Sequence, residues 1–176
     1  MIRRICVLAC AVALALSLAS PASAAKRTVR DERGDAVRSI DFTKVKVANS
    51  KNYLRVRVTI PRFRRAKAGT VGASIAVDGR ASFLYVGRTR RASDERWTKP
   101  RMLNNETGKR VRCAGDRVRF RSNGYVIRVP QRCLRKRGAA VHVEPTTAVR
   151  NAIWSSSLTP PDFDSNDRYG RWVAYR

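Results

Sequence analysis

The residue patterns that support much of enzyme chemistry are missing from this chain. It has a single histidine, His142, and no Gly-x-Ser-x-Gly sequence to present a nucleophilic serine. Its cysteines form no Cys-x-x-Cys motif, and one histidine leaves too few ligands for a usual zinc site. We therefore expect no catalytic residues, no metal and no cofactor, and we interpret His142 as an ordinary strand residue between Val141 and Val143.

Acidic residues are also scarce. The chain has 38 Lys and Arg but only 13 Asp and Glu, for a net charge of +25. Such an excess of one sign favours polyanionic surroundings. The basic runs at 62–65, 88–91 and 135–137 are interpreted as solvated loop charge, and the sequence does not favour nucleic acid as a partner.

Only one long apolar run is present, from Ile5 to Ala19, behind Arg3 and Arg4. It is shorter than the roughly 20 residues of a spanning helix and ends at the small-residue site 22–24. We expect residues 1–24 to be a signal peptide that leaves a secreted or envelope-associated chain, 25–176, with no transmembrane segment and a net charge of +23. Alternatives are cleavage after Ala25 and lipidation at Cys10.

The rest of the chain alternates apolar and polar residues with period two and shows no sustained helical period. About nine short strands separated by turn residues are typical of an antiparallel sandwich. We predict an all-β fold: one two-sheet antiparallel sandwich domain of jelly-roll or immunoglobulin-like architecture. Predicted strands include 54–60, 71–77, 82–86, 118–120, 125–129, 139–143 and 172–175, with loops at 66–69, 88–96 and 155–167.

Two hairpins can be placed in register from the sequence. A turn at Asn123-Gly124 pairs Phe120 with Ile127 and sets Arg119 opposite Arg128. A turn at 49–52 sets Lys46 opposite Arg55 and Lys44 opposite Arg57. Both hairpins then carry cations on the face away from the core. The predicted anion-binding residues are Lys44, Lys46, Arg55, Arg57, Arg117, Arg119, Arg121 and Arg128.

The register of the Asn123-Gly124 hairpin also predicts which two cysteines pair. Its register, extended to the open end, brings Cys113 opposite Leu134 and within one residue of Cys133. In an exported chain, cysteines placed side by side in this way predict a disulfide.

An acidic loop near the C-terminus has the spacing of a calcium site. Asp162, Asp164 and Asn166 stand at positions one, three and five, but Asp167 replaces the expected glycine and Val173 the bidentate glutamate. This is not an EF-hand, and an irregular calcium site with Asp162, Asp164 and Asp167 is the weak alternative to a loop that pairs with arginines. Asp162 and Asp164 could also form a glycosidase pair, although nothing in the sequence fixes their separation.

Several short motifs carry a resemblance. They are Asp31-x-x-Gly34-Asp35, Ile40-Asp41, Val129-Pro130-x-x-Cys133-Leu134 and an aromatic strand after Asp167. With these motifs the chain resembles a group of uncharacterised secreted β-sandwich proteins of high-GC Gram-positive bacteria. It is more distantly similar to DOMON-like domains and carbohydrate-binding modules, which bind sugars or haem. The resemblance implies a compact sandwich with a disulfide and supplies no catalytic residues; no haem-ligand pair is evident here.

The sequence thus favours an exported, non-catalytic module that binds anionic cell-envelope polymers, such as a teichoic-acid-like polymer, or acidic polysaccharide. The alternative is a neutral-carbohydrate or small-ligand module with a platform of Trp97, Trp154 or Trp172. A secreted hydrolase is the third hypothesis.

Overall fold

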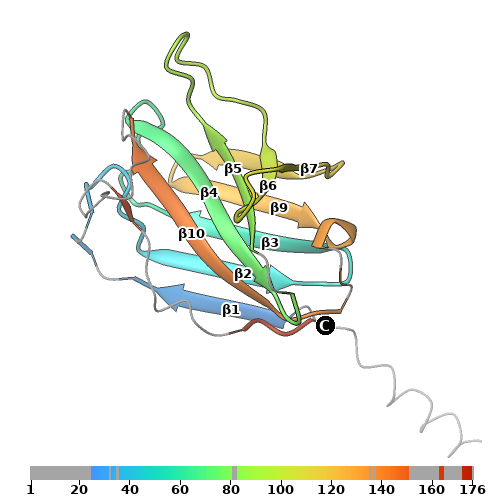
Figure 1. Cartoon of the computed structure of the whole chain (residues 1–176). Coiled ribbons are helices and arrows are strands. Elements are labelled where there is room, and N and C mark those ends of the chain that lie inside the picture. The colour runs from blue at the N-terminus through green and yellow to red at the C-terminus, as the bar shows by residue number, and fades with distance from the viewer. Residues whose placement is uncertain are drawn as a thin grey trace, which may run out of the picture.

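Two antiparallel sheets packed face to face make up the fold (Figure 1). The computed structural model describes residues 25–175 except 32, 35, 81, 82, 135, 137, 151–162 and 165–171. Sheet A has five strands in the order β1-β2-β3-β9-β8, and sheet B has six in the order β11-β10-β4-β5-β6-β7. The elements are β1 (Ala25–Arg30), β2 (Lys44–Asn49), β3 (Tyr53–Thr59), β4 (Ala68–Val77), β5 (Leu84–Thr89), β6 (Arg101–Asn104), β7 (Arg110–Val111), β8 (Arg117–Arg121), β9 (Gly124–Pro130), the 3-10 helix η1 (Gln131–Leu134), β10 (Val141–Val149) and β11 (Phe163–Asp164).

The predicted all-β sandwich is confirmed. The expected signal peptide, residues 1–24, lies outside the described residues. Within the part that the structure describes, no helix has the length and apolar character that a membrane crossing requires.

Sheet A is half-buried, as its period-two alternation predicts. Along β3, Leu54, Val56 and Val58 are buried, while Arg55 and Arg57 between them are exposed. The same alternation in β2 and β8 turns one face of the sheet toward the core and the other toward water.

The register predicted for the β2–β3 hairpin is wrong by two residues. Asn49 pairs with Leu54, so Lys46 lies opposite Arg57 and Lys44 opposite Thr59. The turn lies one residue further along the chain than predicted, because Asn49 is fully buried and its side chain makes contacts with distant segments. Its side-chain amide donates hydrogen bonds to the carbonyl oxygens of Ala139 and Val173.

The β8–β9 hairpin slips by two residues as well. Phe120 pairs with Tyr125, Arg119 with Val126, and the two-residue loop is Ser122-Asn123. Gly124 is not free for the turn, because it lies opposite Thr59 of β3 and a Cβ there would collide with the carbonyl oxygen of Val58. A shift by two keeps every side chain on its predicted face.

The core lies between the sheets and is held by both apolar packing and a few buried polar contacts. Tyr125 on β9 is fully buried, and its hydroxyl reaches across to sheet B. There it lies 2.9 Å from the carbonyl oxygen of Thr146 and 3.1 Å from that of Gly72. Because an unpaired buried hydroxyl would be costly, this contact fixes sheet A against the β4–β10 pair.

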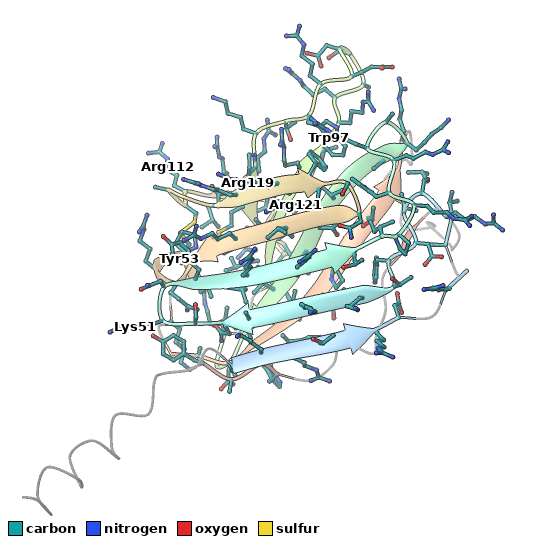
Figure 2. The ribbon with its side chains drawn as sticks, turned by 180° about the vertical axis from the view of Figure 1, so that it is seen from behind. Lys51, Tyr53, Trp97, Arg112, Arg119 and Arg121 are labelled. Atoms are coloured by element: carbon teal, nitrogen blue, oxygen red, sulfur yellow. A yellow bond between two sulfur atoms is a disulfide. The ribbon has the colours of Figure 1, made fainter. Side chains whose placement is uncertain are left out.

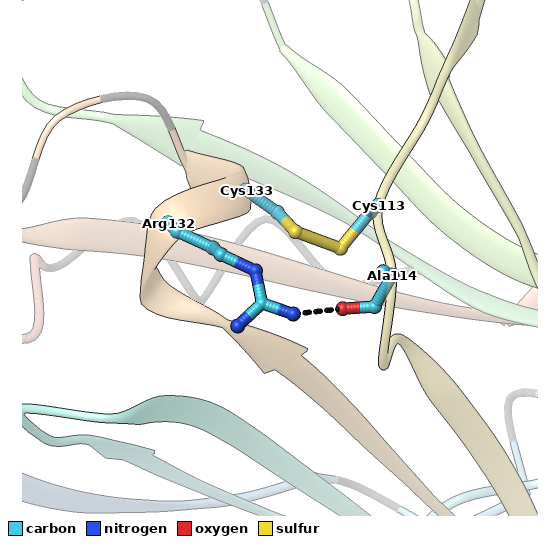
Figure 3. Close-up of a disulfide and its surroundings, with 4 residues drawn as sticks. All are labelled: Cys113, Ala114, Arg132 and Cys133. Carbon is cyan, nitrogen blue, oxygen red and sulfur yellow. Dashed lines mark hydrogen bonds between the residues drawn. A yellow bond between two sulfur atoms is a disulfide. The ribbon is translucent and has the colours of Figure 1, made fainter.

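The predicted disulfide joins Cys113 to Cys133, with the two Cα atoms 5.5 Å apart (Figure 3). It links the segment before β8 to η1, which follows β9, and so closes the open end of the hairpin. Arg132 reinforces the link by donating a hydrogen bond of 2.6 Å to the carbonyl oxygen of Ala114. The disulfide forms despite the shifted register of the β8–β9 hairpin, because a shift of two residues still leaves Cys113 within one position of Cys133.

Candidate functional site

The outer face of sheet A gathers ten cations, which we call the basic face (Figure 2). All eight cations predicted from the hairpins lie on it, exposed or, for Lys44 and Arg128, half-buried. Two further cations come from β1, which pairs with β2. The basic face consists of Lys26, Arg30, Lys44, Lys46, Arg55, Arg57, Arg117, Arg119, Arg121 and Arg128.

Pairing of β3 with β9 turns two separate ladders into one surface. Arg55, Arg128 and Arg117 stand directly opposite one another on three adjacent strands. Neighbouring strands lie about 4.8 Å apart, so these like charges are forced together at some tenths of a kcal/mol for each pair. Lys46 opposite Arg57 repeats the arrangement one row further along.

Acidic residues do not balance the basic face. None occurs in the five strands of sheet A, and none of the ten cations forms an ion pair with another described residue. The ion pairs of the described chain lie elsewhere: Glu95 pairs with Arg90 and Arg150, and Asp94 with Arg91. The cations of the basic face are therefore available to an external anion.

A shallow hollow of about 390 Å³ opens on the basic face. We call it the arginine hollow, and it is lined by Ala48, Ser50, Tyr53, Arg55, Arg117, Arg119, Arg121, Val126 and Arg128. Val126 is only 9% exposed although it points away from the core. Arg57 and Arg119 flank it in register, and the aliphatic stems of such arginines cover apolar surface while their charged ends stay in water.

Arg128 is the central cation of this hollow. Its guanidinium carbon lies 3.4 Å from the ring centroid of Tyr53, a cation–π contact that holds the planar group against the ring. No hydrogen bond to another described residue occupies its N–H groups. A guanidinium fixed in this way can hold a carboxylate, sulfate or phosphate in bidentate fashion with little further ordering.

A second hollow, of about 250 Å³, adjoins the first through Tyr53. We call it the tyrosine hollow; its lining is Lys51, Asn52, Tyr53, Pro130, Gln131, Arg132 and Tyr175. Gln131 is 3% exposed and donates a 2.6 Å hydrogen bond to Asn49. Its carbonyl oxygen Oε1 is buried and accepts no hydrogen bond within the described part of the chain.

The aromatic residues near the basic runs pack on each other. Phe120 stacks on Phe63 with centroids 6.1 Å apart and contacts Trp97 at 4.7 Å, which closes the sandwich beside β8. Arg65 and Arg88 lie over the Phe120 ring. Burial lowers the pKa of Arg88, and the charge of Arg65 lowers it further. Trp97 is therefore a half-buried packing residue instead of an open sugar platform.

His142 lies on β10 and is thus a strand residue, as predicted from the sequence. Its Nε2 is 3.7 Å from a carboxylate oxygen of Glu144, and its ring meets the edge of Trp172 at 6.1 Å. Among the described residues, no three histidine, cysteine or acidic side chains gather into a metal site.

Of the acidic loop proposed for calcium, only Asp164 belongs to a described element, β11. Asp162 and Asp167 lie outside the described residues, as does Trp154. The calcium and glycosidase interpretations of this loop stay predictions.

Lys26, Arg30 and Tyr53 belong to the site but were not predicted from the sequence. The alternation of β1 is visible in the sequence, but Arg27 on its inward side breaks the apolar pattern. Tyr53 gave no signal, because its partner Arg128 is distant in sequence and is brought close only by the β3–β9 pairing.

Comparisons with protein-family models, with curated protein sequences and with solved structures found no match.

Proposed function

We propose that residues 25–176 form an exported, non-catalytic module that binds anionic cell-envelope polymers or acidic polysaccharide. The single observation that supports this best is the basic face, ten cations on one sheet surface without an acidic residue among its strands. Nucleic acid is the less favoured polyanion, because the phenylalanine rings next to the basic runs, Phe63 and Phe120, stack on each other and are not open to bases.

The binding mechanism follows from the spacing of the charges. Residues two apart on a strand are separated by about 6.7 Å, so β2, β3 and β8 each present evenly spaced cations to a long polymer. Folding brings like charges together at a small cost, which a bound polyanion offsets. Binding also releases the counterions of the polymer, which is an entropic gain that needs no particular sequence of residues in the ligand.

Binding of purified residues 25–176 to teichoic acid, heparin and a neutral glucan of equal length tests this function. At low salt we expect both anionic polymers to bind and the neutral glucan not to bind, because the Coulombic attraction requires charge on both partners. Isothermal titration calorimetry measures all three. Binding of the neutral glucan alone would contradict the proposal.

A neutral-carbohydrate module is the second candidate, and one observation favours it. Trp172 is 48% exposed and its ring meets that of His142, whose Nε2 is buried 3.7 Å from the more exposed carboxylate of Glu144. An exposed indole beside hydrogen-bonding groups suits a sugar ring. In this case Trp172→Ala would abolish binding to the neutral glucan, and salt would have little effect.

Export is part of the proposal and has its own test. The disulfide is compatible with an oxidising compartment, and we expect the secreted protein to begin at Ala25, or at Lys26. Mass spectrometry of culture supernatant measures the N-terminus. Recovery only from the membrane with residues 1–24 attached would contradict it.

A further inference from the structure

The two hollows around Tyr53 have a size and shape that a purely electrostatic surface does not need. The arginine hollow measures about 390 Å³ and the tyrosine hollow about 250 Å³, and Tyr53 lines both. Small-molecule sites are usually clefts of about 300 to 1,000 Å³, a range that includes the arginine hollow. Together the hollows have room for more than a single charged group.

The arginine hollow has the chemistry of an oxyanion site with an apolar floor. Five arginines line it, and the nearly buried Val126 lies among them. Arg55 and Arg117 flank Arg128 in register, so their N–H groups can converge on one anionic group. The apolar surface of Val126 and Ala48 suits the C–H face of a ring.

The tyrosine hollow is less cationic and offers a different set of contacts. Two aromatic rings, Tyr53 and Tyr175, line it with the cations Lys51 and Arg132. The Oε1 of Gln131 is buried and does not face a ligand, so the hollow offers its two tyrosine rings and its two cations. Sugar rings stack on tyrosine, and their hydroxyl groups accept hydrogen bonds from lysine and arginine.

We propose that these hollows are adjacent subsites for consecutive ring sugars of an acidic polysaccharide. The residue that carries a carboxylate or sulfate occupies the arginine hollow, and its hydroxyl-bearing neighbour occupies the tyrosine hollow. This inference rests on the proposed function and narrows it, because the rest of the basic face attracts any polyanion while the pair of hollows prefers polyanions built of sugar rings.

The test compares ring-containing and ring-free polyanions at equal charge concentration. The probes are polygalacturonate and heparin, which contain pyranose rings, and poly-glutamate and polyphosphate, which do not. We expect residues 25–176 to bind the first two about tenfold more tightly, as one well-placed charge-assisted hydrogen bond or ring contact allows. Tighter binding of polygalacturonate assigns the arginine hollow to carboxylate, and tighter binding of heparin assigns it to sulfate.

Three variants test which residues are responsible for the preference for ring-containing polyanions. Tyr53→Leu removes the stacking ring, and Arg128→Lys keeps the charge but loses the bidentate fork. Both should abolish the preference for ring-containing polymers. Arg57→Lys is the matched control, because Arg57 lies on the basic face but lines neither hollow, and it should retain the preference. Thermal unfolding verifies that each variant is folded.

The outcomes separate the two proposals. If all four polymers bind equally well, or if Tyr53→Leu and Arg128→Lys keep the preference, the subsites are refuted while the basic face stands. If none of the four binds at low salt, the proposed function itself fails.

Discussion

Replacing Arg55 and Arg128 by serine is expected to weaken binding to heparin or teichoic acid at least about tenfold, because each removed cation takes away one or more charge-assisted hydrogen bonds. These arginines occupy adjacent positions on β3 and β9 in the middle of sheet A. Neither forms an ion pair in the described chain, so their removal leaves no buried carboxylate unpaired. The stability of the folded domain should change little, because the relief of repulsion between the opposed arginines is offset by the loss of the contact between Arg128 and Tyr53.

The control removes the same net charge from another place. Arg91 and Arg96 belong to the loop between β5 and β6, where Arg91 pairs with Asp94 at 2.8 Å. The Arg91→Ser/Arg96→Ser variant should lose less than about threefold in affinity, because only the long-range field changes and it is screened within about 8 Å at physiological ionic strength. Equal losses in the two double variants would show that total charge matters and the basic face does not.

Removing the disulfide is expected to produce the largest change in stability. The Cys113–Cys133 link closes a loop with a sequence separation of 20, for which chain entropy gives about 3 kcal/mol of the free energy of unfolding. For a domain of this size the Cys113→Ser/Cys133→Ser variant should melt about 6 to 12 °C lower. Differential scanning calorimetry of the oxidised wild type and the double variant measures the difference.

Reduction of the wild type provides the matching control. Dithiothreitol should lower its melting temperature to that of the double variant and leave the double variant unchanged. An unchanged melting temperature in both experiments would contradict the stabilising role of the link. Below the melting transition, the hydrogen bond from Arg132 to Ala114 keeps the hairpin end together, so polymer binding should decrease less than stability does.

Much of this fold was predictable because the face of a strand residue depends only on period two. Both hairpin registers were wrong by two residues, yet Arg55, Arg57, Arg119 and Arg128 still point away from the core. An even shift preserves the face, whereas a shift by one would have reversed it. The disulfide was predictable for a similar reason, since it tolerated the same shift.

The errors in the two predicted hairpin registers arise from contacts between segments that are distant in sequence. Asn49 and Gly124 are both strong turn residues, but each is used for a contact across the fold. Asn49 links β2 to the segments at Ala139 and Val173, and Gly124 lets β9 approach β3. Local turn propensity cannot reveal such distant partners.

The ends of some strands, and the pairing of strands that are distant in sequence, were also not predicted. β4 begins at Ala68, inside a predicted loop, and the predicted strand at 172–175 is reduced to a bridge between Val173 and Val141. The pairing of β3 with β9 determines that the two basic ladders form one surface. That pairing joins segments about seventy residues apart, and the residue pattern of neither segment indicates which strand it pairs with.

If charge on the basic face drives polymer binding, the affinity of the wild type should depend steeply on salt, which a salt titration measures. A flexible polyanion that contacts the five arginines of the arginine hollow should give a slope of log affinity against log salt of about −3.5, by analogy with single-stranded nucleic acid. Heparin affinity should then fall about 100-fold between 50 and 200 mM salt. A heparin affinity that stays constant over that range would show that charge on the basic face does not drive binding.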